Sequence, residues 1–182
     1  PFSPRNPAGA IEAGVVLVPE ERQSQGLVLN RSIRENITLP HLGNISARGL
    51  FINLSAERSV SEQTGKSVRL KAASLGQKVS QLSGGNQQKV VFARWLVQSP
   101  RILLLDEPSR GVDVGARFEI YRIIRDLAAH GVGILLVSSD LNELLGLSDR
   151  VIVMREGRQM AELDAAGLSQ ETVLRYCYGE EK

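Results

Sequence analysis

The chain has 182 residues, of which 42% are hydrophobic and 23% are charged, a composition typical of a globular domain and not of a disordered protein. Its 22 basic residues exceed its 20 acidic residues by only two, which does not favour a protein that binds nucleic acid. No apolar run is long enough to cross a bilayer, and the single cysteine, Cys177, excludes an intramolecular disulfide and favours a reducing compartment.

The first part of the chain predicts one strand followed by a polar, mostly helical region. The apolar run 15–18, bounded by glycine and proline, is typical of a short buried strand. Ser32 and Glu35 have the spacing of a capping box, so we expect a helix to begin after Ser32. Residues 40–80 are polar and mixed, and they predict short helices and loops in a lobe separate from the sheet.

The second part of the chain predicts a strand–helix–strand unit and therefore a parallel sheet. The continuous apolar runs 102–105 and 134–137 are typical of parallel strands buried on both faces. Between them, apolar residues recur at helical spacing over 115–129, and a right-handed crossover places the two strands in one sheet. The other elements that we expect are a helix over 87–98, a hairpin turning at Glu156 and Gly157, and a helix beginning at Ser169.

Two carboxylates, Asp106 and Glu107, follow directly on the strand 102–105. In α/β folds the carboxyl ends of parallel strands line the crevice in which ligands bind. One carboxylate at such a place can bind Mg²⁺, while the other orients or deprotonates an attacking water. The alternative is a strand end whose two acids simply face the solvent.

The segment Leu82 to Asn86 reads Leu-Ser-Gly-Gly-Asn and lies directly before the predicted helix. Its two glycines allow backbone N–H groups to approach an anion, and Ser83 adds a hydroxyl donor. The dipole of the following helix favours negative charge at the same place. Two interpretations are open at this point: an anion site, and a turn that only connects two helices.

Three segments together resemble the nucleotide-binding domain of ABC transporters: LSGGNQQK at 82–89, RILLLDEPSRGVD at 101–113 and ILLVSSD at 134–140. The chain resembles in particular the ATP-binding subunits of bacterial carbohydrate importers of the ribose, galactose and xylose type. Such subunits contain two nucleotide-binding halves, and residues 9–180 resemble the second half. The resemblance implies an α/β fold, a partial P-loop NTPase lobe of the RecA type with a parallel sheet and an added α-helical subdomain.

In ABC transporters the signature loop contacts the γ-phosphate of a nucleotide held by the opposite half. The residues that match this loop, and that would bind nucleotide, are Ser83, Gly84, Gly85 and Asn86. Asn86 stands where the family usually has glutamine, which is a mild change because both side chains are amides. Asp113 matches the D-loop, which crosses the interface between the two halves.

The resemblance also implies catalytic residues. Asp106 matches the Walker B aspartate at Mg²⁺, and Glu107 matches the glutamate that acts on the attacking water. Glu20 occupies the position of the Q-loop glutamine, but an ionised carboxylate cannot donate a hydrogen bond and adds negative charge near the phosphates. Ser139 occupies the position of the switch histidine, and its hydroxyl is shorter and never cationic. Both replacements predict weak hydrolysis at the site of this half, and both are familiar in second halves of carbohydrate importers.

No segment of the chain matches the phosphate-binding pattern GxxxxGK[ST]. Residues 64–67 end like that pattern, but Val60 stands where its first glycine is required and no apolar strand precedes it. The chain begins with Pro1, so we expect a preceding segment to carry the phosphate loop, without which the fragment would not bind ATP and Mg²⁺ and would be inactive. His41 and His130 have no partner at metal-ligand spacing, and we expect them in a loop and at a helix end.

The resemblance divides the chain into three parts and implies its partners. We expect a remnant of the nucleotide-binding core over 1–29, the helical subdomain with the signature loop over 30–98, and the Walker B, D-loop and switch core over 99–182. The implied partners are the first half of the same subunit, membrane permease subunits and, indirectly, a periplasmic sugar-binding protein, at the cytoplasmic face of the inner membrane. The alternative is a non-transport ABC ATPase acting on ribosomes or DNA, which would favour basic linkers or coiled-coil insertions.

A last expectation concerns the edge of the sheet. Strands 15–18, 102–105 and 134–137 are expected to neighbour one another in that order. In the family, the phosphate-loop strand lies between 134–137 and a strand that begins at Val151. An edge exposed there would attract a partner strand, so we expect self-association or a displaced hairpin over 151–163.

Overall fold

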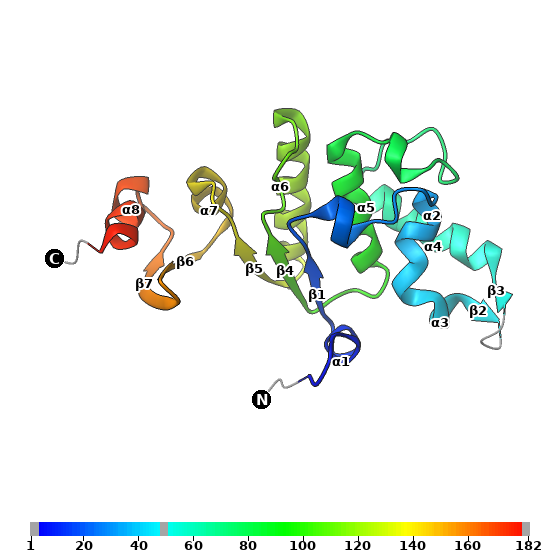
Figure 1. Cartoon of the computed structure of the whole chain (residues 1–182), viewed down its shortest axis with the longest axis horizontal. Helices are drawn as coiled ribbons and strands as arrows, with labels where there is room; N and C mark the ends of the chain where they lie inside the picture. Colours follow the sequence, from blue (N-terminus) through cyan, green and yellow to red (C-terminus); the bar gives the residue numbers. More distant parts are fainter. Residues whose placement is uncertain (1–3, 48–50, 180–182) are drawn as a thin grey trace. The chain divides into compact units, whose positions relative to one another are not determined.

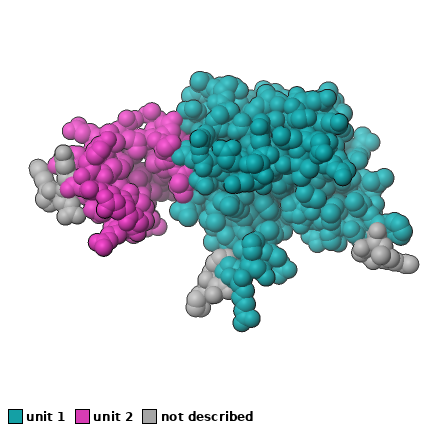
Figure 2. Space-filling model, viewed as in Figure 1, with its two compact units in different colours: residues 1–135 teal, residues 136–182 magenta. Residues whose placement is uncertain are grey.

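The computed structural model describes residues 4–47 and 51–179. It divides the chain into two compact units, residues 1–135 and residues 136–182, which Figure 2 draws in teal and magenta. This boundary differs from those of the three-part division into 1–29, 30–98 and 99–182, which stays a prediction. Within the described ranges, no helix has both the length and the apolar character that a membrane span requires.

The larger unit is built on a three-stranded sheet, as predicted. β1 (Val15–Val18), β4 (Ile102–Asp106) and β5 (Gly133–Val137) neighbour one another in that order (Figure 1). β1 pairs in parallel with β4, so the two strands present matching rows of side chains. The side chains in these two rows that are buried, each at most 2% exposed, are Val16, Val18, Leu103 and Leu105.

The other face of this sheet differs from the prediction. The continuous apolar runs predict strands buried on both faces, whereas Leu17, Ile102 and Leu135 are 47%, 41% and 55% exposed. Buried side chains therefore alternate with half-buried or exposed ones along β1 and β4, and half-buried side chains alternate with exposed ones along β5. An apolar run indicates that both faces of a strand tend to avoid water, but it does not specify which segment covers each face.

Two long helices follow the predicted motifs. α6 (Val114–Ala129) agrees with the predicted helix 115–129, and His130 caps its C-terminal end as expected. α5 (Gly84–Leu96) begins three residues before the predicted start at Gln87, so the two glycines lie in its first turn and not in a preceding loop. The difference arises because Ser83 has the extended backbone of an N-cap, after which glycine can adopt helical angles like any other residue.

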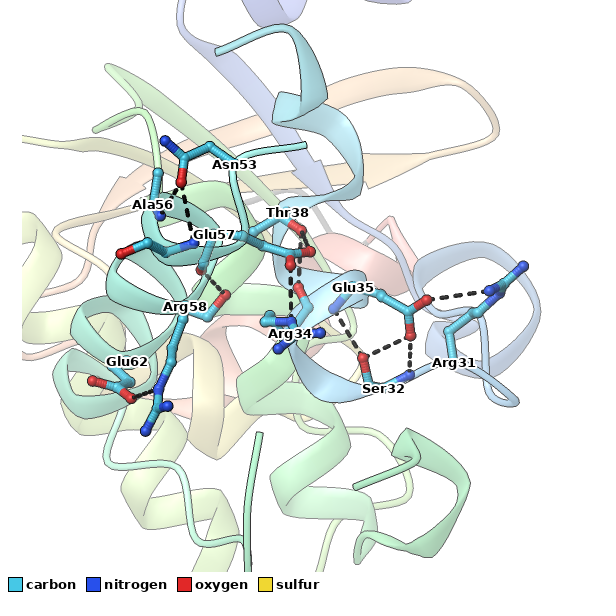
Figure 3. Close-up of polar contacts among 12 residues, drawn as sticks. Arg31, Ser32, Arg34, Glu35, Thr38, Asn53, Ala56, Glu57, Arg58 and Glu62 are labelled. Atoms are coloured by element: carbon cyan, nitrogen blue, oxygen red, sulfur yellow. Dashed lines mark hydrogen bonds and ion pairs between the residues drawn. The ribbon is translucent and has the colours of Figure 1, made fainter. Parts of the chain in front are cut away.

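The region 30–80 forms a helical lobe on one side of the sheet (Figure 1). The predicted capping box is confirmed: Ser32 Oγ accepts from the Glu35 N–H at 3.2 Å, and Glu35 Oε2 accepts from the Ser32 N–H at 2.8 Å (Figure 3). The elements of the lobe are α2 (Ile33–Thr38), α3 (Leu42–Ile45), β2 (Ser46–Ala47), β3 (Phe51–Ile52) and α4 (Leu54–Ser67).

Residues 40–80 were expected to contain only short helices and loops, and this expectation is wrong in two respects. α4 is 14 residues long, and β2 pairs with β3 in an antiparallel ladder. The sequence of α4 lacks an apolar stripe because the helix buries polar groups that are paired. Glu57 is 3% exposed, and its carboxylate accepts from Thr38 Oγ1 at 3.1 Å and forms an ion pair with Arg34 at 2.9 Å (Figure 3).

His41 is a buried residue and not the loop residue that we expected. It is 3% exposed, its Nε2 lies 2.8 Å from the carbonyl oxygen of Arg94, and its ring packs edge-on against Trp95. Burial lowers the pKa of His41. Arg94 donates from Nε to the carbonyl oxygen of Asn36 at 2.8 Å, so this buried network joins α2 to α5, and burial lowers the pKa of Arg94 to about 10.

The smaller unit contains α7 (Leu141–Leu147), the hairpin of β6 (Arg150–Arg155) and β7 (Arg158–Asp164), and α8 (Gln170–Tyr178). The hairpin turns at Glu156 and Gly157 as predicted; both have positive φ, as a tight two-residue hairpin turn requires. Among the described strands, β6 and β7 form a sheet of their own, while self-association stays a prediction. The core of this unit is made by Val151, Val153 and Val173, and Leu168, which precedes the start of α8, packs against it.

Candidate functional site

The two candidate carboxylates lie at the carboxyl end of β4. Asp106 is the last residue of the strand, and Glu107 follows it with a φ of 46°, in the left-handed region. The Arg110 N–H donates to the carbonyl oxygen of Glu107 at 3.0 Å and closes a tight turn. A non-glycine residue in that region costs about 1–3 kcal/mol, and such residues cluster at active sites. The turn redirects the chain from β4 toward Asp113.

The predicted signature loop forms the start of α5. Ser83 is the exposed N-cap, but among the described residues its side chain makes no capping hydrogen bond to the helix. Its Oγ instead accepts from Asn86 Nδ2 at 3.1 Å, while Asn86 Oδ1 accepts from the Lys71 N–H at 2.9 Å. The backbone N–H groups of the first turn are therefore left for another acceptor, and a helix N-terminus of this kind binds anions.

The two glycines of this loop also have a packing role, which sequence reasoning did not anticipate. A Cβ at Gly85 would lie under 3.0 Å from the Cβ of Ala116 in the first turn of α6. A Cβ at Gly84 would lie 2.8 Å from Arg22 Nη2 and 3.1 Å from the carbonyl oxygen of Gly111. Glycine at both positions therefore allows the start of α5 to approach the start of α6 and the loop before it.

Asp113 is brought together with the signature loop by this close approach. It is the N-cap of α6, and its Oδ1 accepts from the Ala116 N–H at 2.9 Å. Ala116 is the residue that faces Gly85, so the candidate D-loop and the candidate signature loop meet at the first turns of two helices. Two motifs separated by more than twenty residues in sequence thus form one surface.

Glu20 joins the same surface through an ion pair with Arg110 Nη1. The positive charge of Arg110 offsets the negative charge that this carboxylate was expected to add near phosphates. Two residues farther along, Arg22 donates from Nη1 to the carbonyl oxygen of Arg110 at 2.7 Å and from Nη2 to that of Gly111 at 3.1 Å. Sequence reasoning assigned no role to either arginine: Arg22 belongs to a polar stretch with no periodicity, and Arg110 lies in the segment 101–113 beside the residues that carry the resemblance.

Ser139 lies in the smaller unit, in the turn between β5 and α7. Its neighbours organise the start of α7: the Asp140 N–H donates to Ser138 Oγ at 3.1 Å, and Asp140 Oδ1 accepts from the N–H groups of Asn142 and Glu143. The role of Ser139 toward a nucleotide stays a prediction.

The residues at the end of β4 are compatible with a magnesium ion. Within residues 4–47 and 51–179, no three metal-ligating side chains gather in one place. Mg²⁺ commonly binds one or two carboxylates and completes its shell with water and phosphate oxygens. Asp106, half-buried at the strand end, suits that kind of site.

The stretch 64–67 is not a phosphate loop. It forms the last turn of α4, where Thr64 Oγ1 donates to the carbonyl oxygen of Val60 at 3.0 Å and Ser67 Oγ donates to that of Thr64 at 2.8 Å. A phosphate loop precedes its helix, so that backbone N–H groups at the helix start face the anion. The structure thus agrees with the exclusion of this stretch on sequence grounds.

Solved structures with a similar fold are ATP-binding cassettes. A dimeric ATP-binding cassette in a post-hydrolysis state, bound to ADP and Pi, has a TM-score of 0.70 and 25% sequence identity, covering 87% of this chain and 66% of that one. The cbiO1 protein from Clostridium perfringens, part of the ABC transporter complex cbiONQ, has a TM-score of 0.72 and 20% identity, covering 93% and 65%. These likenesses confirm the α/β fold with a parallel sheet.

Curated relatives are named for sugar import. The chain is 49% identical over 174 residues to the ribose import ATP-binding protein RbsA of Jannaschia sp. (strain CCS1), covering 96% of this chain and 34% of that protein. It is 49% identical over 175 residues to the xylose import ATP-binding protein XylG of Geobacillus kaustophilus (strain HTA426), with coverage of 96% and 34%. The chain therefore spans about a third of the length of these relatives.

The family assignment follows from a family model as well as from these relatives. Residues 7–110, more than half of the chain, match the model described as ABC transporter. That range contains β1, the helical lobe, α5 and β4 with its two carboxylates. The chain belongs to the ABC transporter family.

Proposed function

We propose that this chain is the second nucleotide-binding half of the ATP-binding subunit of a bacterial carbohydrate importer. The observation that carries the proposal is the meeting of the signature loop and the D-loop, where Gly85 packs against Ala116 and Gly84 against Gly111. This surface would face the nucleotide held by the first half. The names of the relatives, for ribose and xylose import, support a sugar as the transported substrate.

The two nucleotide-binding sites of the subunit would hydrolyse ATP at unequal rates. Ser83, Gly84, Gly85 and Asn86 would bind the γ-phosphate of the nucleotide held by the first half, through the N–H groups at the start of α5. Asp113 would lie at the interface between the halves. This division of labour rests on the intact signature loop of the present chain.

At the site of this half, Asp106 would hold the Mg²⁺ of bound ATP, which neutralises charge on the phosphates. Glu107 would act on the attacking water from the strained turn after β4. Glu20 is paired with Arg110, and Ser139 replaces the histidine usual at its position. This site is therefore expected to hydrolyse ATP weakly, and the phosphate loop that it needs would lie in a preceding segment.

Transport would follow from opening and closing of the two halves. ATP binding would close them on each other, and hydrolysis would reopen them, moving membrane permease subunits at the cytoplasmic face of the inner membrane. A periplasmic sugar-binding protein would deliver the sugar to those permease subunits. Copurification of the subunit with nucleic acid in place of a permease would contradict this proposal and favour an ABC ATPase acting on ribosomes or DNA.

The division of labour is tested by serine substitutions in the longer subunit that contains this chain. Ser83→Ala is expected to lower the steady-state ATPase rate about ten-fold or more, because a donor at a transferring phosphoryl group is lost. Ser139→Ala is expected to change the rate much less, since that site is already weak. Ser55→Ala, on the exposed start of α4, is the matched control. Equal losses for Ser83→Ala and Ser139→Ala would contradict the proposal.

A further inference from the structure

Arg22 lies where three segments of the candidate site meet, and none of the recognised motifs includes it. It is the first residue of a π-helical turn, Arg22–Gly26, that follows β1 and Glu20. Its guanidinium donates to two successive carbonyl oxygens, from Nη1 to Arg110 at 2.7 Å and from Nη2 to Gly111 at 3.1 Å. These partners are 88 and 89 residues away in sequence, in the loop that leads to Asp113.

The guanidinium of Arg22 also sets how closely the signature loop can approach that loop. A Cβ at Gly84 would lie 2.8 Å from Arg22 Nη2, and a Cβ at Gly111 would lie 3.6 Å from both Nη atoms. The planar guanidinium of Arg22 therefore fills the space between Gly84 and Gly111. Gly111 has a φ of 65°, in the left-handed region, which residues other than glycine adopt only at a cost in free energy.

Arg22 acts here as a pair of main-chain donors and not as the counter-ion of a carboxylate. Among the described residues, its Nε is buried with no hydrogen-bond partner, and burial lowers the pKa of Arg22. Glu21, the neighbouring residue in the chain, has a smaller opposite effect on the pKa of Arg22, and Glu20 is paired with Arg110. A fork with two parallel N–H donors fixes geometry in a way that a single ammonium group does not.

A second contact ties the same turn to α5. Gln23 Nε2 donates to Gln87 Oε1 at 3.0 Å, and the Gln87 N–H donates to the Ser83 carbonyl oxygen at 2.9 Å. The turn after Glu20 therefore contacts both sides of the candidate site. A displacement of this turn would move the signature loop and the Asp113 loop together.

We infer that Arg22 is a positioning residue, whose two-pronged contact with Arg110 and Gly111 holds the signature loop and the Asp113 loop in register. Its consequence for turnover rests on the proposed function, because those two loops would contact the nucleotide held by the first half. A shift of the turn after Glu20 would therefore move the signature loop and the Asp113 loop, which would act on that nucleotide.

The structural part of this inference is tested by amide hydrogen exchange on the 182-residue chain without nucleotide. In Arg22→Ala and Arg22→Lys, peptides covering 83–88 and 107–113 are expected to exchange about ten-fold faster than in the unsubstituted chain. Arg58→Ala and Arg58→Lys, at an exposed ion pair on α4, are the matched controls and should leave these peptides unchanged. Lysine keeps the positive charge but lacks the two parallel N–H donors of the guanidinium. Arg22→Lys therefore separates the effect of the charge from the effect of the paired donors.

The exchange experiment has three outcomes that would overturn the inference. One is unchanged exchange of both peptides in Arg22→Ala. A second is an equal rise in every peptide of the chain, which would indicate general destabilisation. The third is full rescue by Arg22→Lys, because a positive charge without the fork would then be sufficient.

The consequence for turnover is tested in the longer subunit that contains this chain. Arg22→Ala and Arg22→Lys are expected to lower its ATPase rate about ten-fold, while the Arg58 variants keep the unsubstituted rate. Unchanged turnover in both Arg22 variants would overturn the link between Arg22 and hydrolysis. If the unsubstituted subunit hydrolyses no ATP, the proposed function fails, while the exchange experiment still decides the role of Arg22 in the chain.

Discussion

At the scale of single residues, the signature loop combines anion chemistry with tight packing. Gly85 is buried and lies against Ala116, so its hydrogen occupies a place in which a methyl group does not fit. Ser83 and Asn86, in contrast, are partly or fully exposed and hydrogen-bonded to each other. The same five-residue motif therefore contains two glycines that close packing requires, Gly84 and Gly85, and two polar residues that remain accessible to a ligand.

Gly85→Ala is expected to lower the free energy of unfolding by about 1–3 kcal/mol, because the added methyl group forces α5 away from α6. Urea unfolding of the chain measures the change. Gly43→Ala is the control, since a Cβ at Gly43 meets nothing within 4 Å. Adding Ala116→Gly to Gly85→Ala should restore part of the loss. Equal stability of the Gly85→Ala and Gly43→Ala variants would contradict this packing argument.

At the scale of elements, α5 and α6 are joined by a charged cluster as well as by the glycine contact. Lys89 on α5 has a side chain only 1% exposed, and its Nζ lies 2.5 Å from Glu119 Oε2 on α6 and 2.9 Å from the carbonyl oxygen of Arg69. Lys71 contacts the other oxygen of Glu119 at 3.0 Å. The hydrogen bonds from Lys89 and then Lys71 lower the pKa of Glu119 to about 2.

Glu119→Gln is expected to destabilise the chain at pH 7 by about 3 kcal/mol, the low end for a broken buried pair, because the buried side chain of Lys89 would lose its carboxylate partner. The pKa of Glu119 is lower in the folded chain than the usual value of about 4.3, so the unfolded chain takes up the proton first. The stabilisation by the carboxylate is therefore complete above about pH 4.3 and is lost as the pH falls toward 2.

Urea unfolding of the unsubstituted chain and of the Glu119→Gln variant between pH 7 and pH 2 measures the difference in their free energies of unfolding. The two stabilities should converge at the acidic end. Glu62→Gln, which removes the carboxylate of an exposed pair on α4, is the control and should have a much smaller effect at every pH. A difference between the Glu119→Gln variant and the unsubstituted chain that does not depend on pH would contradict this account.

At the scale of the whole molecule, we expect nucleotide binding to need residues beyond the 182 of the present chain. The sequence contains no GxxxxGK[ST] pattern, and the stretch 64–67 that most resembles it is helical. A calorimetric titration of the 182-residue chain with Mg-ATP up to millimolar concentration is expected to give no heat of binding, whereas the longer subunit should bind. Saturable binding to the chain with a micromolar constant would contradict this expectation and indicate another phosphate site.

Local physical chemistry was sufficient to predict much of this fold. The apolar runs of β1, β4 and β5 coincide with strands, because a short apolar run between turn residues favours a buried strand. Their order in the sheet was expected from the family resemblance and is confirmed. The capping box at Ser32 and the hairpin turn at Glu156 and Gly157 also follow from neighbours within a few residues. Family resemblance added the site residues, because their identities and spacing form ordered motifs.

The tertiary structure decided those features whose partners are distant in sequence. α4 contains no apolar stripe, and Glu57 is buried in it only because Thr38 and Arg34 on α2 supply its hydrogen bond and ion pair. Gly85 owes its close packing to Ala116 on α6, and Arg22 owes its role to two carbonyl groups nearly ninety residues away. A sequence read by itself determines what each segment prefers, whereas burial and long-range hydrogen bonds depend on which segments the fold brings together.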